Sequence, residues 1–181
     1  MPMIGVAMTL LEVAVTGRAT EAGSPATAGL LLSVMSVASA AGGLWWGRLH
    51  HRHDPAVQLG GLLVVLAAGS IATGLLPSLA AVTVALALAG LATSPVFVVT
   101  YLLADELVPA TAQVEASTWL TTTHNLGGSA GAAAAGVLID RYSAPSGFIV
   151  GGVLFTVTAT LFIKRPQAEP EAPSPHDARS Q

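Results

Sequence analysis

One carboxylate, Glu12, lies inside an apolar stretch that is long enough to enter a membrane. Thr9 and Thr16 fall on the same face at helical spacing. A charged side chain at the centre of a membrane helix costs roughly 2.5–3.5 kcal/mol by insertion scales, so such acids are functional candidates by default. Glu12 is therefore a candidate site for a proton or a cation. The alternative is a position near enough to the membrane surface for Glu12 to be hydrated.

His124 and Asn125 form a second polar group, and they directly follow three threonines at 121–123. A neutral imidazole can relay a proton or accept a hydrogen bond from a solute. Hydrogen bonding between helices is the alternative role, and it contributes only ~0.6 kcal/mol on average in membranes. For the threonines we favour hydroxyl bonding to their own helix backbone.

Ser94 and Tyr101 flank a proline in a third apolar stretch. Pro95 removes one helical hydrogen bond and is expected to bend the helix there. Bent or broken helices often border transport sites, although many bends have no site beside them. We therefore include Ser94 and Tyr101 among the candidate site residues.

Two further patterns could suggest chemistry of another kind. Gly127-Gly-Ser129-Ala-Gly131 matches the nucleophile pattern of serine hydrolases, but it lies inside an apolar helical run rather than after a strand. His50, His51 and His53 have poor spacing for a metal site and no carboxylate partner at helical spacing. We predict no enzyme activity, no metal and no cofactor.

Composition shows which elements must position these residues. The chain has 181 residues, of which 52% are hydrophobic and only 9% charged, with a mean hydropathy of +0.69. Soluble domains carry roughly 25% charged residues, so an ordinary soluble enzyme is excluded. A net charge of −3 gives no basic face for nucleic acid. The absence of cysteine excludes a disulfide framework.

Apolar runs between prolines and charges predict an all-α membrane protein with six spans. A membrane helix needs ~20 mostly apolar residues. The predicted spans, which make up one domain over residues 1–165, are 3–20, 26–47, 56–76, 79–104, 116–139 and 145–163. Residues 166–181 are predicted to form a disordered polar tail.

The basic residues of the short loops predict the orientation. Four of them (Arg48, Arg52, Lys164 and Arg165) fall on one side of the membrane, and Arg18 and Arg141 fall on the other. The positive-inside rule therefore places both termini and the loop at 48–54 in the cytoplasm.

A repeated pattern links the second and fifth spans. The pattern Gly42, Gly47, Leu49 and Arg52 recurs 89 residues later as Gly131, Gly136, Leu138 and Arg141. The two spans run in opposite directions, as an inverted 3+3 repeat requires. A shared small-residue packing edge would also explain the match.

The stretch Ser39-Ala-Ala-Gly-Gly-Leu-Trp-Trp-Gly-Arg-Leu, followed by Arg52, resembles the second helix and following loop of a six-helix half of the major facilitator superfamily. The stretch from Val108-Pro-Ala through Glu115 and Asn125-Leu-Gly to Asp140 resembles its helices ten and eleven. The resemblance implies helices seven to twelve, the C-terminal half, and covers nearly all of residues 1–165. The acidic residue of the full loop signature is absent here.

The resemblance implies transport of a small solute by alternating access. In the family the loop after the second helix makes conformation-locking charge pairs, which points to Gly47, Arg48, Arg52 and Asp54. Membrane anchoring by the charges is the alternative. We predict efflux, with possible proton coupling through Glu12, in a bacterial inner membrane.

The predicted partners are the lipid bilayer, the small solute and an N-terminal six-helix half. Because the family has twelve helices, the chain is predicted to be a fragment of a permease, an alternative-start product or one part of a split gene. The alternative is a membrane fragment or subunit that does not transport by itself and needs another half or a homodimer.

Overall fold

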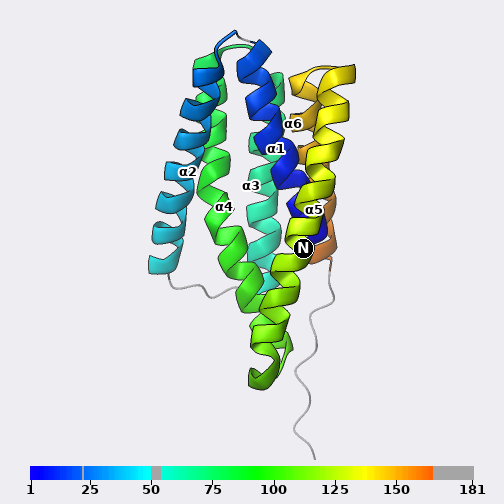
Figure 1. The fold of residues 1–181 in the computed structure, drawn as a ribbon. Helices are drawn as coiled ribbons and strands as arrows, with labels where there is room; N and C mark the ends of the chain where they lie inside the picture. Colours follow the sequence, from blue (N-terminus) through cyan, green and yellow to red (C-terminus); the bar gives the residue numbers. More distant parts are fainter. Residues whose placement is uncertain (22, 50–53, 165–181) are drawn as a thin grey trace, which may run out of the picture.

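The structure, a computed structural model, describes residues 1–21, 23–49 and 54–164, and all of its regular elements are helices. The long helices are α1 (Pro2–Glu21), α2 (Pro25–Arg48), α3 (Pro55–Leu75), α4 (Leu79–Leu107), α5 (Gln113–Arg141) and α6 (Ala144–Ile163). A short 3₁₀ turn, η1 (Ala110–Ala112), precedes α5. Successive long helices run up and down the bundle, so α4 runs opposite to α1 (Figure 1).

Five of the helices in the described residues are long and apolar enough to cross a membrane, namely α1, α2, α3, α4 and α6. The sixth long helix, α5, is long enough to span a membrane but not apolar enough, although the sequence predicts a span at 116–139. The reason is its composition, since hydroxyl, amide and imidazole side chains fill its first half. The predicted tail at 166–181 lies outside the described residues.

Prolines and short polar side chains mark where the helices begin. Pro25 and Pro55 occupy the first helical turn, where a missing backbone N–H costs nothing. The Asp54 carboxylate caps α3 by accepting from the Ala56 backbone N–H at 2.7 Å. Ser24 makes no such bond, so the proline alone marks the start of α2. Inside α4, Pro95 is buried and the helix continues through it.

The helices pack in the spatial order α2, α4, α3, α6, α1, α5, and α1 also contacts α2 while α4 contacts α5. The core lies mainly between α1, α3, α4 and α6 and includes the fully buried rings of Phe148 and Phe155. The packing has a twofold pattern in which α1 matches α4, α2 matches α5 and α3 matches α6. Under this exchange α1·α5 becomes α4·α2, α1·α6 becomes α4·α3, and α3·α6 is unchanged.

Close glycine contacts follow the same exchange between α2·α4 and α5·α1. A Cβ atom at Gly42 would meet the backbone carbonyl of Leu91, and one at Gly131, 89 residues later, would meet that of Val6. Pro95 deprives the Leu91 carbonyl of its helical donor, so the Cα–H of Gly42 faces a free acceptor. Both helix pairs therefore depend on a missing side chain at a matched position.

The central pair α3·α6 is matched in the same way. A Cβ atom at Gly60 would meet the side chain of Ile163, and one at Gly152 would meet that of Ile71. The offset is 92 residues in both directions, from 60 to 152 and from 71 to 163. Small residues thus let the backbones approach closely, as in other membrane helix pairs.

Two charged side chains of α1 cap neighbouring helices at one end of the bundle. The Arg18 guanidinium donates to the Leu76 carbonyl at the end of α3, at 3.0 Å. The Glu21 carboxylate accepts from the Ala144 backbone N–H at the start of α6, at 2.9 Å. The helix dipole favours both contacts, because a positive charge lies at the C-terminus of α3 and a negative charge at the N-terminus of α6.

Candidate functional site

A polar stripe runs along one face of α5. Its side chains are exposed in the six-helix bundle and are spaced at i, i+3, i+4, i+7 and i+11, namely Thr118, Thr121, Thr122, Asn125 and Ser129. Residues at this spacing share a helix face. The Asn125 amide at the centre of this face has donors and an acceptor that lipid cannot satisfy, so the face needs water or polar protein groups beside it. We call these five residues the α5 stripe.

The hydroxyl groups of the α5 stripe mostly donate to their own helix. Thr121 donates to the Ser117 carbonyl at 2.9 Å, and Ser129 donates to the Asn125 carbonyl at 3.0 Å. Thr123, beside the stripe, donates to the Trp119 carbonyl at 2.8 Å. This is the backbone bonding that the sequence predicts for the threonine run. The hydroxyl oxygens keep lone pairs that can accept hydrogen bonds from a solute.

His124 lies between α1 and α4. Its ring meets the ring of Phe97 edge-on, with centroids 5.0 Å apart and an angle of 75°. Its backbone carbonyl faces Gly5 of α1, where a Cβ atom would clash. Nδ1 is buried and has no hydrogen-bond partner among the described residues. An orphaned nitrogen of this kind is either a cost to the fold or a group kept ready for a proton or a ligand.

Tyr101 of α4 meets α5 one helical turn before His124. Its hydroxyl group and that of Thr121 are 2.8 Å apart, and either one can donate. Tyr101 and His124 therefore lie in one seam between α4 and α5. Phe97, which the sequence analysis did not single out, belongs to this seam because it is four residues before Tyr101 and so shares its face of the helix.

Glu12 lies at the middle of α1, and its side chain is exposed in the bundle. Among the described residues its carboxylate makes no ion pair or hydrogen bond, while its backbone carbonyl accepts from the Thr16 hydroxyl at 3.3 Å. Gly5 marks the level of His124 on α1, so Glu12 lies about 10 Å further along that helix at 1.5 Å per residue. The structure thus places Glu12 and His124 on neighbouring helices without contact between them.

Ser94 and Asn125 take different positions. Ser94 packs against α2, where a Cβ atom at Gly43 would come within 2.5 Å of its hydroxyl oxygen. Asn125 projects from the exposed face of α5 as part of the α5 stripe. Of the five candidate residues, the structure therefore groups His124, Tyr101 and Asn125 on or beside α5. Ser94 belongs to the α2·α4 packing seam.

The candidate loop residues are only partly described. Arg48 is the last residue of α2 and is exposed, and Asp54 caps α3. A Cβ atom at Gly47 would meet nothing within 4 Å, so close packing does not require this glycine. Arg52 and the three histidines at 50, 51 and 53 lie outside the described residues. Residues 1–21, 23–49 and 54–164 contain no group of three or more acids and histidines that could hold a metal ion.

The long apolar helices and the confined polar face define a helical membrane protein that crosses the bilayer several times. The chain belongs to the Major Facilitator Superfamily, whose family model matches residues 3–181. This family is one of membrane transporters, and its members are generally not enzymes. No curated protein and no solved structure matches the chain. The resemblance that the sequence analysis drew from the second, fourth and fifth helices is confirmed at the level of the family.

Proposed function

We propose that the chain forms the C-terminal six-helix half of a transporter that moves a small solute by alternating access. The observation that carries this proposal is the position of Glu12, an exposed carboxylate at the middle of a helix that is apolar enough to span the membrane. A carboxylate there faces water or a polar partner, because contact with lipid is costly. In this proposal the carboxylate faces a water-filled cavity between this half and an N-terminal half.

The α5 stripe supplies the second wall of that cavity. Because α5 packs directly against α1, its exposed hydroxyl and amide groups continue the polar surface that begins at Glu12. His124 and Tyr101 lie at the edge of this surface. In this proposal Asn125 and Tyr101 hydrogen-bond the solute, Glu12 carries a proton in exchange for it, and the direction is efflux.

Two sets of contacts support an inverted 3+3 repeat. The close glycine contact in α2·α4 has a counterpart in α5·α1, and the two glycine contacts within α3·α6 are counterparts of each other. Repeats of this kind let two units rearrange about a site between them. The proposal includes a bacterial inner membrane with both termini in the cytoplasm. Arg48, with Gly47, Arg52 and Asp54, would then form the cytoplasmic loop that locks one conformation.

Solute uptake into proteoliposomes tests this function. The tagged chain is purified from its own host with whatever polypeptide accompanies it, and the vesicles receive an imposed pH gradient. We expect accumulation of at least one member of a panel of radiolabelled sugars, amino acids and organic cations, and loss of it when the gradient is collapsed. A stable homodimer without any such accumulation would favour the non-transporting subunit instead.

A further inference from the structure

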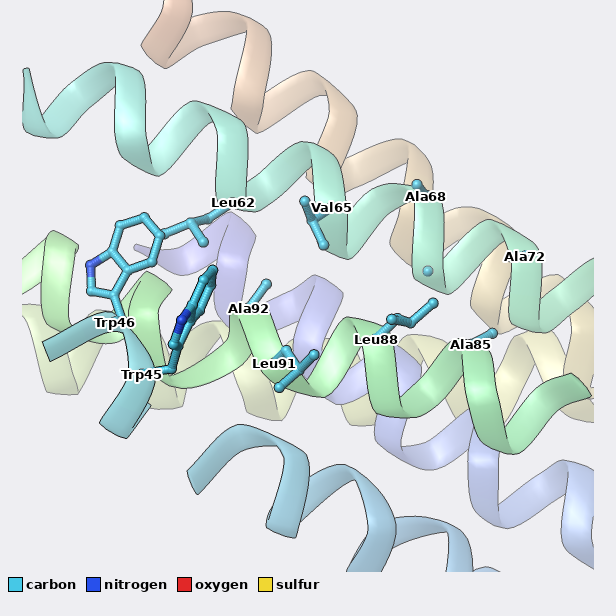
Figure 2. Close-up of a pocket in the computed structure, with 11 residues that line it drawn as sticks. Trp45, Trp46, Leu62, Val65, Ala68, Ala72, Ala85, Leu88, Leu91 and Ala92 are labelled. Carbon is cyan, nitrogen blue, oxygen red and sulfur yellow. The ribbon is translucent and has the colours of Figure 1, made fainter. Parts of the chain in front are cut away.

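A largely apolar groove lies between α2, α3 and α4, outside the candidate site. It has a volume of about 600 Å³. Its walls include Trp45 and Trp46 of α2, Leu62 and Val65 of α3, and Leu88 and Leu91 of α4, with small alanines along its floor. Figure 2 shows the two indole rings at one end and a row of short side chains leading away from them along α3 and α4. We call this cavity the tryptophan groove.

The two tryptophans of the groove distinguish α2 from its matched helix α5. At the matched positions of α5, 89 residues later, stand Ala134 and Ala135, and Ala135 is completely buried. Ala135 follows Gly131 by four residues and so shares the face of α5 that packs against α1. The matched helix α2 carries indole rings where α5 carries methyl groups, and these rings form one end of the groove.

The chemistry of the walls selects the occupant. The lining is almost entirely hydrocarbon, and a water molecule needs two to four polar partners that this groove does not offer. The groove is open along its side, where Trp45 is 62% and Leu88 56% exposed. Because α2, α3 and α4 are apolar enough to cross the bilayer, an exposed hydrocarbon surface on them suits contact with lipid. A flexible hydrocarbon chain fits such a space and gains dispersion contacts with its walls.

Arg48 gives this occupant a polar end. It follows Trp45 by three residues, so both side chains share one face of α2, and Arg48 is exposed at the helix end. Tryptophan rings favour the headgroup level of a membrane. A guanidinium beside them matches a phosphate oxygen pair. The groove therefore has a hydrocarbon slot that ends at a phosphate-binding side chain, which is the order of groups in a phospholipid.

We propose that the tryptophan groove binds one acyl chain of a membrane phospholipid whose phosphate lies at Arg48. This site is separate from the proposed solute cavity and its existence does not depend on transport, but it shares Arg48 with the proposed cytoplasmic loop. The bound chain would fill the space between α2 and α3 and so complete the packing of the bundle on that side.

Native mass spectrometry of the purified protein with phosphatidylglycerol tests this site. Ala68→Phe places a ring in the groove from the exposed surface of α3, and Thr160→Phe makes a matched change on α6, 92 residues later. We expect Ala68→Phe to weaken binding of the first lipid about tenfold, the factor expected for roughly two buried methylenes. Thr160→Phe is expected to bind like the unchanged protein.

Two further variants separate the parts of the proposal. Trp45→Ala removes a wall without adding bulk and should also weaken the first lipid, while Arg48→Gln should weaken it without changing the thermal midpoint. Equal binding by Ala68→Phe and Thr160→Phe would overturn the proposal. So would a dimer that Ala68→Phe converts to a monomer with lipid binding unchanged, because a second copy would then occupy the groove.

Discussion

Replacing Gly131 with leucine is expected to separate α5 from α1 and to destabilise the bundle. A Cβ atom at this position would come within 2.6 Å of the Val6 carbonyl and 2.9 Å of its Cα, so backbone would have to move. Inserting side chains into well-packed contacts costs about 1–3 kcal/mol and occasionally more. We expect the thermal midpoint in detergent to fall by roughly 5–10 °C.

Gly136 provides the matched control on the same helix. A Cβ atom there would meet nothing within 4 Å, so Gly136→Leu should leave the midpoint unchanged. The other unit offers the same comparison with Gly42→Leu and Gly47→Leu. If the two substitutions of a pair lowered the midpoint equally, the close contact would not be what holds these helices together.

Replacing Glu12 with glutamine is expected to abolish transport driven by a pH gradient. Glutamine keeps the size and hydrogen-bonding capacity of the side chain but cannot carry a proton. We expect uptake to fall about 100-fold, the lower end of what a positioned proton-transfer group contributes. Uptake is measured in proteoliposomes with an imposed pH gradient, and exchange of unlabelled for labelled solute without a gradient is measured in parallel.

Glu115→Gln is the control for this experiment. Glu115 is also exposed, but it lies in the first turn of α5 rather than inside a span of apolar residues. The Glu115→Gln variant should therefore transport like the unchanged protein. Gradient-driven uptake that survives Glu12→Gln would refute a proton-carrying role for this carboxylate. Loss of exchange as well as gradient-driven uptake would assign Glu12 to solute binding instead.

Prolines in the first turn let the sequence predict where α2, α3 and α6 begin, and a charge or another break predicts where each of them ends. The predicted span at 56–76 corresponds to α3 (Pro55–Leu75), and that at 145–163 corresponds to α6 (Ala144–Ile163). Where a helix begins and ends depends on residues that are close to each other in the sequence, so these limits can be predicted without knowing the tertiary structure. The family model matches residues 3–181, so the resemblance drawn from local stretches such as Gly42 to Arg48 is confirmed at the level of the family.

The contacts of the candidate site depend on tertiary packing and are not visible in the sequence. His124 meets Phe97, which is 27 residues away, and the residue types alone do not indicate that partner. The tryptophan groove has a similar origin, because its walls come from three helices that lie side by side only in the folded bundle.

Cysteine labelling along α5 tests the central claim, that the polar face of this bundle borders a water-filled path. The chain has no cysteine of its own, so every single-cysteine variant is free of background. A charged, membrane-impermeant maleimide is applied to membranes that contain cysteine at Thr122, Asn125 or Ser129, or at Val64 and Leu161, which are exposed on the apolar helices α3 and α6. We expect labelling at the three α5 positions and none at Val64 or Leu161. Labelling that is absent from all three α5 positions, or equal at all five, would contradict it.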